Sequence, residues 1–371
     1  MKAVILAAGY ATRLQPYARL YPKTLLRVGG RPLLDATVEA LAAASEIDSV
    51  VLVTNNRYLG FFERWRARST AARLRPVVVL DDGTTSNESR RGSVGDLLFA
   101  MDRLGLDEDL LVVCSDKVFG FSIPAFLQFA REKGGCANTC EDAGDPAKLA
   151  GRHGCEVLAP DGRITEFREK PVRPRSSIAS IAFYVFPRAA LPLIRDYGRA
   201  DIRADAPGTM MEWLCPRTPT YAWMIDGECL DVGDPASYRE ADRVAWEKQG
   251  KKAVALEVLL DARTGDGGAL ERLLGRLEGE PCVRMAHLAV DPADRQRYQA
   301  WLTEHPHLVP VDVLAASAPA EELRRSRGCS WIIEVDALAA GIDVAGLLRG
   351  EATSGAALVV RGGRMVPPHR P

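Results

Sequence analysis

The stretch Ala3-Val4-Ile5-Leu6-Ala7-Ala8-Gly9-Tyr10-Ala11-Thr12-Arg13-Leu14, followed at a short distance by Pro22-Lys23, is the most informative part of the sequence. Its apolar first half predicts a buried strand, and its second half predicts a loop of small residues. Such a loop turns several backbone N–H groups toward one point, where they can bind phosphate oxygens. Arg13 adds a planar guanidinium for bidentate phosphate binding, and Lys23 adds a mobile positive charge. Because a short glycine loop often only turns the chain, the neighbouring pattern has to decide between the two interpretations.

The first 130 residues alternate apolar runs with helical patterns. We expect strands at 2–8, 49–54, 76–80 and 109–114, and helices at 33–44, 59–68 and 95–104. This order predicts a parallel sheet with helices on both faces. In such sheets a ligand binds beyond the carboxyl ends of the strands, which is where Gly9, Asn55, Asp81 and Asp116 fall.

The pattern changes along the rest of the chain. Residues 135–250 read as shorter strands with more turns, and a helix over 235–249 is expected to end at Gly250. The last part alternates again, with strands expected at 253–260, 283–290, 309–314, 331–335 and 356–360, and helices at 268–277 and 292–305. We therefore expect two domains, 1–250 and 253–371, of which the second is a smaller α/β domain whose role the sequence does not indicate.

Composition and charge argue against several classes of function. The 371 residues are 47% hydrophobic and 26% charged, which is typical of a globular protein with a large core. A net charge of −1 favours neither nucleic acid nor an anionic membrane as a partner. The apolar runs are shorter than the ~20 residues of a membrane span, and the N-terminal one is too short for a signal peptide. The eight cysteines are not spaced like a disulfide framework, which fits a protein of the reducing cytoplasm. The sequence does not decide whether the protein forms a homo-oligomer.

Four potential metal ligands lie near one another in the sequence: Cys136, Cys140, His153 and Cys155. The spacing of the first two is not the tight paired loop of a structural zinc site. Both segments, 135–141 and 154–158, also read as neighbouring strands in which cysteine serves as a small apolar residue. The sequence therefore favours a core role over zinc binding.

Two aspartates are candidates for a magnesium site. Asp116 follows the apolar strand 110–114, where its side chain would emerge over the edge of the sheet. Asp231 lies in Cys229-Leu230-Asp231-Val232-Gly233-Asp234-Pro235, just ahead of a helix. Magnesium prefers one or two carboxylates together with phosphates and waters. Either aspartate could instead only cap a turn, although Asp234 is the better capping candidate for the helix.

These segments together resemble the sugar-phosphate nucleotidyltransferases, in particular proteins similar to glucose-1-phosphate thymidylyltransferase, over about residues 1–248. The family signature L-A-x-G-x-G-T-R-L, followed by P-K, corresponds to 6–14 and 22–23. The G-D-N and W-x-D-x-G-T-P motifs correspond to 115–117 and 229–235. The resemblance implies a Rossmann-like, mixed but mainly parallel sheet of the GT-A-like type.

The resemblance also implies roles for individual residues. Arg13, Lys23 and Asp116 would be catalytic, and Asp116 and Asp231 would hold Mg²⁺. Glu169-Lys170-Pro171 matches the family's E-K-P motif, in which the glutamate accepts hydrogen bonds from sugar hydroxyls and the lysine holds the sugar phosphate. The nucleotide would contact Ala8, Gly9, Thr12, Arg13, Lys23, Arg90 and Gly95, and the acceptor would contact Gly154, Glu169, Lys170 and Tyr184. Core packing explains Tyr184 equally well.

Several positions depart from the family's pattern. Ala11 replaces the second loop glycine, which costs about 1 kcal/mol if φ is positive there. Lys117 and Cys229 stand in place of asparagine and tryptophan, and an ammonium beside a metal ligand is expected to alter metal affinity or to contact the substrate. In the loop 84–97, which takes the place of the base-recognition loop, Gly95 is expected to open a helix that can meet an anion or a base edge. Arg90 could serve guanine or a phosphate, so the base stays open.

The expected function is magnesium-dependent transfer of a nucleotidyl group from a nucleoside triphosphate to a sugar 1-phosphate, or to a sugar-like cyclitol 1-phosphate, with release of pyrophosphate. Two alternatives within this chemistry are a guanylyl- or adenylyltransferase for valienol-type pseudo-sugars of antibiotic biosynthesis, and a choline-phosphate or phosphonate cytidylyltransferase. A hypothesis of another class is a non-catalytic regulator that binds nucleotide. A dinucleotide-binding oxidoreductase is disfavoured, because the first loop lacks G-x-G-x-x-G and no acidic residue ends the second strand.

Overall fold

The computed structural model describes residues 1–200, 206–250, 256–262 and 267–316, and the strands 331–334, 358–361 and 364–366. The chain forms two compact units. The first comprises Met1–Tyr10 and Leu34–Asp231, and the second comprises Ala11–Leu33 and Val232–Pro371. The expected division into domains near residue 250 stays a prediction, and the linker residues 251 and 252 lie outside the described residues.

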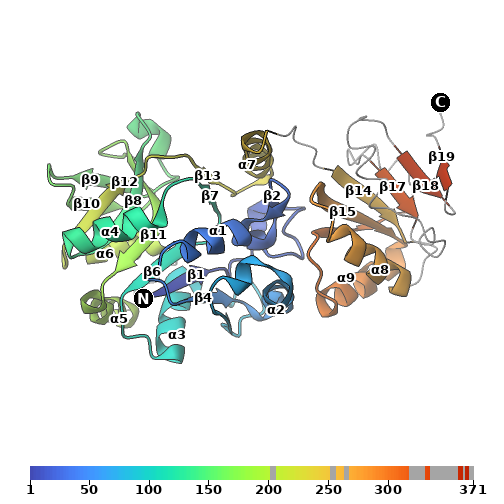
Figure 1. Cartoon of the computed structure of the whole chain (residues 1–371), viewed down its shortest axis with the longest axis horizontal. Coiled ribbons are helices and arrows are strands. Elements are labelled where there is room, and N and C mark those ends of the chain that lie inside the picture. Colours follow the sequence, from blue (N-terminus) through green and yellow to red (C-terminus); the bar gives the residue numbers. More distant parts are fainter. Residues whose placement is uncertain are drawn as a thin grey trace. The chain divides into compact units, whose positions relative to one another are not determined.

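The first unit is built on a nine-stranded mixed sheet (Figure 1). Its main path runs in the order β10-β9-β11-β6-β1-β4-β5, and β8 pairs with both β11 and β12. The pairs β1–β4, β1–β6, β4–β5 and β8–β12 are parallel, whereas β11 is antiparallel to each of its partners. The strand bounds are β1 Lys2–Leu6, β4 Ser49–Thr54, β5 Val77–Asp81, β6 Leu110–Cys114, β8 Cys136–Asp142, β9 Cys155–Leu158, β10 Ile164–Arg168, β11 Ile178–Phe186 and β12 Thr220–Met224.

Both faces of this sheet are buried, as the continuous apolar runs of its strands require. In β1, Val4 and Leu6 pack in one core cluster with residues of α3, while Ala3 and Ile5, which point to the opposite face, are also fully buried. The helices of the unit are α1 Leu33–Ala42, α2 Leu59–Arg68, α3 Gly92–Leu104, α4 Ile123–Lys133, α5 Leu191–Arg199 and α6 Pro207–Leu214. The expected mainly parallel sheet with helices is therefore confirmed.

The register of the parallel strands brings their carboxyl ends to a common level. Leu6 of β1 pairs with Val53 of β4 and with Cys114 of β6. The loops that follow these three strands therefore leave the sheet side by side, and each carries residues singled out in the sequence. A second ladder lies just beyond β6, where β7 Lys117–Phe119 pairs antiparallel with β13 Cys229–Asp231.

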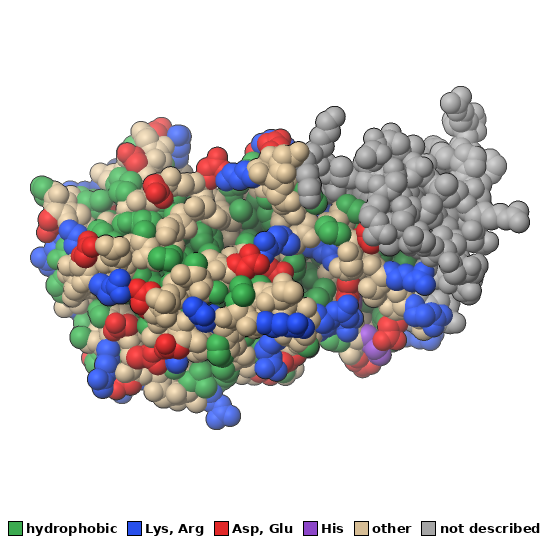
Figure 2. Space-filling view, viewed as in Figure 1, with side chains coloured by type: hydrophobic (Ala, Val, Ile, Leu, Met, Phe, Trp, Pro, Cys, Tyr) green, Lys and Arg blue, Asp and Glu red, His purple; other side chains and the backbone are tan. Residues whose placement is uncertain are grey.

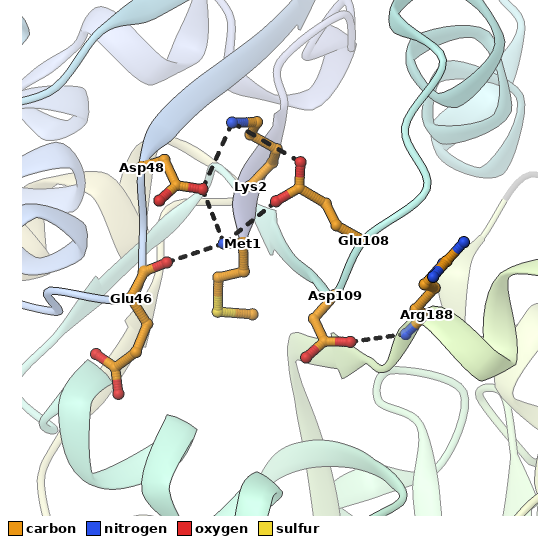
Figure 3. A network of polar contacts seen from close by, with 7 residues as sticks. All are labelled: Met1, Lys2, Glu46, Asp48, Glu108, Asp109 and Arg188. Carbon is orange, nitrogen blue, oxygen red and sulfur yellow. Dashed lines mark hydrogen bonds and ion pairs between the residues drawn. The ribbon is translucent and has the colours of Figure 1, made fainter.

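Charged groups hold the amino end of β1, at the end of the strand opposite to the signature loop (Figure 3). The N-terminal ammonium of Met1 donates to the Glu46 backbone oxygen at 3.0 Å and lies 2.9 Å from a carboxylate oxygen of Asp48 and 3.2 Å from one of Glu108. Lys2 extends the same network to Asp48 and Glu108. These contacts fix the start of the central strand, whereas the signature loop follows its carboxyl end.

The second unit contains a six-stranded sheet in the order β16-β15-β14-β17-β18-β19 (Figure 1). All of its pairs are parallel except β18–β19. Leucines of α8 and Leu302 of α9 pack with residues of β14, β15 and β16 in one buried cluster. The bounds are β14 Leu256–Asp261, α8 Gly267–Leu277, β15 Val283–Val290, α9 Arg295–Glu304, β16 Val311–Ala315, β17 Trp331–Glu334, β18 Leu358–Arg361 and β19 Arg364–Val366.

Polar contacts join the sequence-distant parts of the second unit. The short hairpin β2 Arg27–Val28 and β3 Arg31–Pro32 packs against α7 Pro235–Lys248, where Tyr238 donates a hydrogen bond to the Arg27 backbone oxygen at 2.9 Å. The buried Arg27 guanidinium donates to the backbone oxygens of Leu277, Glu278, Glu280 and Val283. The segment 11–33, which carries the second half of the signature loop, is therefore part of this unit's core.

Several expected elements differ from the structure in detail. Helix α3 begins at Gly92 rather than at Gly95. The two cysteine-bearing strands β8 and β9 are not direct neighbours, because β11 lies between them and pairs with both. Asp234 caps α7 as expected, with its carboxylate accepting from the amides of Ala236 and Ser237. Residues 253–255, 335, 356 and 357 of the expected C-terminal strands lie outside the described residues.

The described surface is polar and mixed in charge. On the face shown in Figure 2, acidic and basic side chains are interspersed over the described residues. None of the described helices is both long enough and apolar enough to cross a membrane.

Candidate active site

The loop after β1 is anchored from both neighbouring strands. The buried Asn55, which follows β4, donates a hydrogen bond from its amide to the Ala8 backbone oxygen at 2.8 Å. Ser115, which follows β6, donates from its hydroxyl to the Leu6 backbone oxygen at 2.8 Å. Gly9 is exposed, and a Cβ on it would meet no atom within 4 Å. Anchored backbone with an open glycine is the arrangement that lets a bulky anion approach the main chain.

The second half of the signature loop is strained at one residue. Ala11 has φ 45° and ψ 44°, in the left-handed region that favours glycine. The positive φ considered for this position is thus present, and the alanine side chain costs about 1 kcal/mol there. Thr12 and Arg13 follow in a short helical turn and are exposed, and the half-buried Lys23 begins the next turn, directly after Pro22. All five of these residues belong to the second unit.

Asp116 and Asp231 are brought together by the β7–β13 ladder. Asp231, the last residue of β13, is paired with Lys117, the first residue of β7, and Asp116 directly precedes Lys117. The Lys117 ammonium lies 2.9 Å from Oδ1 of Asp231 and 3.9 Å from Oδ1 of Asp116. Because one cationic nitrogen reaches both carboxylates, the two side chains converge on a single point beside the carboxyl end of the central sheet.

The convergence of Asp116 and Asp231 shows whether these residues fit a divalent cation. The donors are two carboxylates, the ligand type that magnesium uses together with phosphates and waters. The Asp116 and Asp231 side chains are 31% and 42% exposed, so further ligands can reach the same point. Among the described residues no group of three or more His, Cys, Asp and Glu side chains is placed to hold a metal. The aspartate pair therefore fits a cation whose other ligands come from outside the protein.

The charges around the pair favour an ammonium over a neutral amine. Burial alone would lower the pKa of Lys117, but Asp116 and Asp231 outweigh it, and the pKa of the ammonium is raised. Burial also raises the pKa of the Cys229 thiol to about 12, even though Lys117 acts in the opposite direction. Cys229 is therefore a neutral thiol at neutral pH, the less nucleophilic form of cysteine.

The E-K-P segment is shaped by helix α6. The Glu169 amide donates to a carboxylate oxygen of Glu212 at 2.6 Å, and Glu169 Oε1 lies 3.2 Å from the Lys170 ammonium. Lys170 has φ 47°, so this turn is held in a strained backbone conformation. A Cβ on Gly208 would lie 1.9 Å from Glu169 Oε2, which makes glycine the only residue that leaves the glutamate its place.

Gly154 and Tyr184 have packing roles in the structure. A Cβ on Gly154 would lie 2.8 Å from the Phe167 ring and 3.1 Å from Ser180 Cβ, so the glycine allows close packing of β9 on its neighbours. Tyr184 is buried in β11, its ring is stacked with Phe186, and its hydroxyl lies 3.5 Å from the Ser180 hydroxyl. These observations leave the expected acceptor contacts of both residues as predictions.

A buried polar cluster beside Gly154 was missed by sequence reasoning. The Asn138 amide donates to Glu156 Oε1 and, at 3.0 Å, to the Ser180 hydroxyl. Glu156 and Asn138 are fully buried, and burial raises the pKa of the Glu156 carboxyl to about 8 despite the hydrogen bond from Asn138. The sequence signal for this cluster was a polar residue, Asn138, at an inward position of an otherwise apolar strand. Only the pairing of β11 with both β8 and β9 shows that Asn138 and Glu156 meet.

Of the two residues expected in the base-recognition loop, Gly95 is placed differently from its prediction. Gly95 lies within the first turn of α3, so its amide is not at the helix start, and a Cβ there would meet Arg91 Cβ at 2.9 Å. The residue at the start of this helix is Gly92, which has φ 77°. Arg90 is exposed and donates to the Asn87 backbone oxygen at 2.8 Å. Neither its position nor this contact favours a particular base.

Solved structures share the fold over about two thirds of the chain. A UDP-glucose pyrophosphorylase complexed with UDP-glucose superposes with a TM-score of 0.55 and 18% identity, over 67% of this chain and 98% of that protein. A structure from Bacillus anthracis, a suggested glucose-1-phosphate thymidylyltransferase in complex with sucrose, gives a TM-score of 0.55 and 22% identity, over 67% and 96%. At these identities the likeness establishes the fold alone.

Curated relatives share sequence over a similar fraction of the chain. A protein of Sulfolobus acidocaldarius, a suggested mannose-1-phosphate guanyltransferase, is 31% identical over 64% of this chain and 61% of its own length. Mannose-1-phosphate guanylyltransferase 1 of Arabidopsis thaliana is 27% identical over 69% and 67%, and the UTP–glucose-1-phosphate uridylyltransferase of Haloferax volcanii is 28% identical over 67% and 98%. The chain thus spans about two thirds or less of the length of the first two of these relatives.

The signature, the aspartate pair and the E-K-P segment all lie in the first two thirds of the sequence. A sequence model of the nucleotidyl transferase family matches residues 2–247, which include every candidate site residue described above. The chain therefore belongs to the nucleotidyl transferase family.

Proposed function

We propose that this protein transfers a nucleotidyl group from a nucleoside triphosphate to a sugar 1-phosphate, or to a sugar-like cyclitol 1-phosphate, and releases pyrophosphate. The observation that carries the proposal is the convergence of Asp116 and Asp231 on one cation position beside the end of β6. Family membership and the names of the relatives, which include guanylyl-, adenylyl- and uridylyltransferases of sugar 1-phosphates, support the same reaction class.

Nucleotidyl transfer is limited by charge rather than by covalent chemistry. Negative charge on the phosphate oxygens repels the incoming phosphate, so catalysis depends on positioning and on cations. We assign Arg13 and Lys23 to the triphosphate and the departing pyrophosphate, because a guanidinium and an ammonium follow the anchored glycine loop in the signature order. The backbone at Ala8 and Gly9 would approach the nucleotide where no side chain blocks it.

Mg²⁺ is the cation that we assign to Asp116 and Asp231. Their oxygen ligands and their exposure fit an ion that keeps phosphate and water ligands. When bound, Mg²⁺ would neutralise charge on the phosphate oxygens of the nucleotide. Asp231 is held in the β7–β13 ladder, and Asp116 directly precedes the first residue of β7.

We assign the acceptor to the E-K-P segment. The Glu169 side chain, only 18% exposed and set beside Gly208, can accept hydrogen bonds from hydroxyl groups in a fixed direction. The Lys170 ammonium is 54% exposed and can bind the acceptor's phosphate. A hydroxylated ring with one phosphate is the chemistry that these two groups recognise, which sugar 1-phosphates and cyclitol 1-phosphates share.

A non-catalytic regulator is the second candidate, and one observation favours it. Lys117 places a positive charge between the two aspartates, so the protein could bind nucleotide without a metal. In that case Asp116→Asn would change nucleotide binding without removing any turnover, because there would be none to remove.

A product screen tests the proposed reaction. The purified protein with Mg²⁺ is incubated with each of five nucleoside triphosphates and a pool of sugar and cyclitol 1-phosphates, and products are identified by mass spectrometry. A nucleoside-diphosphate-linked product, absent with Asp116→Asn, is the expected result and identifies base and acceptor together. Nucleotide binding without any product from the whole pool would instead support the regulator.

A further inference from the structure

Lys117 is the residue that the proposed reaction does not use and that the structure places at its centre. Its ammonium lies 2.9 Å from Asp231 and 3.9 Å from Asp116, and its side chain is only 16% exposed, less than that of either aspartate. A magnesium ion bound by the same carboxylates would need the position that this ammonium now takes. The two cations therefore exclude one another.

The backbone that presents Lys117 is well fixed. Residues 117–119 form β7, and the next glycine continues the ladder, with the Gly120 amide donating to the Glu228 backbone oxygen at 3.1 Å. The Phe119 ring packs against those of Phe121 and Phe183, each with ring centroids 4.8 Å apart. Lys117 is thus a placed side chain on a packed strand, and its long aliphatic part is the element that can move.

The Lys117 ammonium can leave the aspartates because carboxylate and phosphate oxygens are both good partners for it. A lysine between two carboxylates satisfies both charges in the absence of substrate. A nucleoside triphosphate brings several phosphate oxygens, which are good partners for a lysine ammonium, and it also brings a chelated divalent cation. Exchange of the ammonium from carboxylate to phosphate leaves the aspartates open for that cation without leaving a charge unpaired.

We propose that Lys117 is a built-in counter-ion that occupies the cation position between Asp116 and Asp231 until nucleotide arrives, so that the divalent cation enters with the triphosphate and not before it. The inference rests on the proposed function, since it concerns the metal of that reaction. It predicts that the protein without nucleotide binds a divalent cation weakly, and that removal of the ammonium creates affinity.

Binding of Mn²⁺ to the nucleotide-free protein tests this directly, with the free ion measured by electron paramagnetic resonance. Lys117→Met is expected to bind one Mn²⁺ with a Kd about tenfold to a hundredfold lower than the unsubstituted protein, the range that loss of one charge-assisted contact implies. Lys117→Arg keeps the positive charge and should bind as weakly as the original chain. Lys248→Met, at an exposed lysine in the last turn of α7, is the matched control and should change nothing.

The location is tested by adding Asp231→Asn to Lys117→Met, which should abolish the gained affinity. Equal Mn²⁺ affinity of Lys117→Met and the original chain, or a gain that survives Asp231→Asn, would overturn the proposal. Circular dichroism checks that each variant folds, and Lys117→Asn, which is shorter and neutral, carries the same prediction if the methionine variant does not fold. Because no nucleotide is present, these results stand apart from the product screen, in which the proposed reaction itself succeeds or fails.

Discussion

The buried carboxyl of Glu156 gives a prediction whose size follows from its surroundings. The side chain is fully buried, accepts a hydrogen bond from Asn138, and its second oxygen, Oε2, has no hydrogen-bond partner among the described residues. Burial raises its pKa from 4.5 to about 8, so the folded protein keeps a proton that the unfolded chain loses above pH 4.5.

The sign of the effect follows from this difference in bound protons. Because the folded state holds more protons between pH 4.5 and 8, its stability is greatest at the acidic end of that window and falls as the pH rises toward 8. At about 1.4 kcal/mol per pH unit, raising the pH from 5 to 7.5 removes about 3 kcal/mol. For a unit of this size the loss corresponds to a fall in Tm of roughly 6–12 °C.

Glu156→Gln isolates this contribution, because the amide keeps an oxygen for Asn138 and cannot ionise. Scanning calorimetry at pH 5 and pH 7.5 measures the difference in Tm between the variant and the original chain. This difference should shift in favour of the variant by roughly 6–12 °C at the higher pH. Glu132→Gln, on the exposed side of α4, should show no such shift. A gap between Glu156→Gln and the original chain that stays constant from pH 5 to 8 would refute the reasoning.

Three further predictions concern the site and the second unit. Gly208→Ala should raise the KM for the acceptor about tenfold by displacing Glu169, whereas Gly275→Ala, which adds a methyl group in open space, should not; steady-state kinetics decide. Asp116→Asn should reduce pyrophosphate formation by about a hundredfold or more while the protein stays folded, and activity near that of the original chain would exclude Asp116 as a ligand of the required cation. Arg27→Met should destabilise the second unit by about 3 kcal/mol, because it leaves buried backbone oxygens without donors; a calorimetric transition unchanged from that of the original chain would contradict this.

Local patterns in the sequence were sufficient for much of the fold. The bounds of β4, α2 and β15 coincide with the expected ranges. In each of these segments the pattern of apolar residues differs from that of the flanking residues, so its ends can be found from the sequence. The start of α3 was misplaced because Gly92 and Gly95 both fit a helix start, and a positive φ at Gly92 is visible only in the structure. The placement of β11 between β8 and β9 depends on long-range pairing, which no local pattern encodes.

The candidate site divides in the same way. The signature loop and the aspartate after β6 follow from residue types at strand ends, where a parallel sheet places its ligands. The contact of Lys117 with Asp231 was not predictable in detail, because β7 and β13 are three-residue strands with no alternating pattern. The close approach of Gly208 to Glu169 likewise joins α6 to a loop that is distant in sequence.

The proposed reaction transfers the α-phosphorus of a nucleoside triphosphate to an acceptor phosphate. The most direct test follows two labels through the reaction with an acceptor identified by the product screen, one on the α-phosphate and one on the γ-phosphate of the nucleotide. We expect the α-label to appear in the nucleoside-diphosphate-linked product and the γ-label in pyrophosphate, and we expect Asp116→Asn to remove both signals together. Transfer of the γ-label to the acceptor, or release of labelled inorganic phosphate without a linked product, would contradict it.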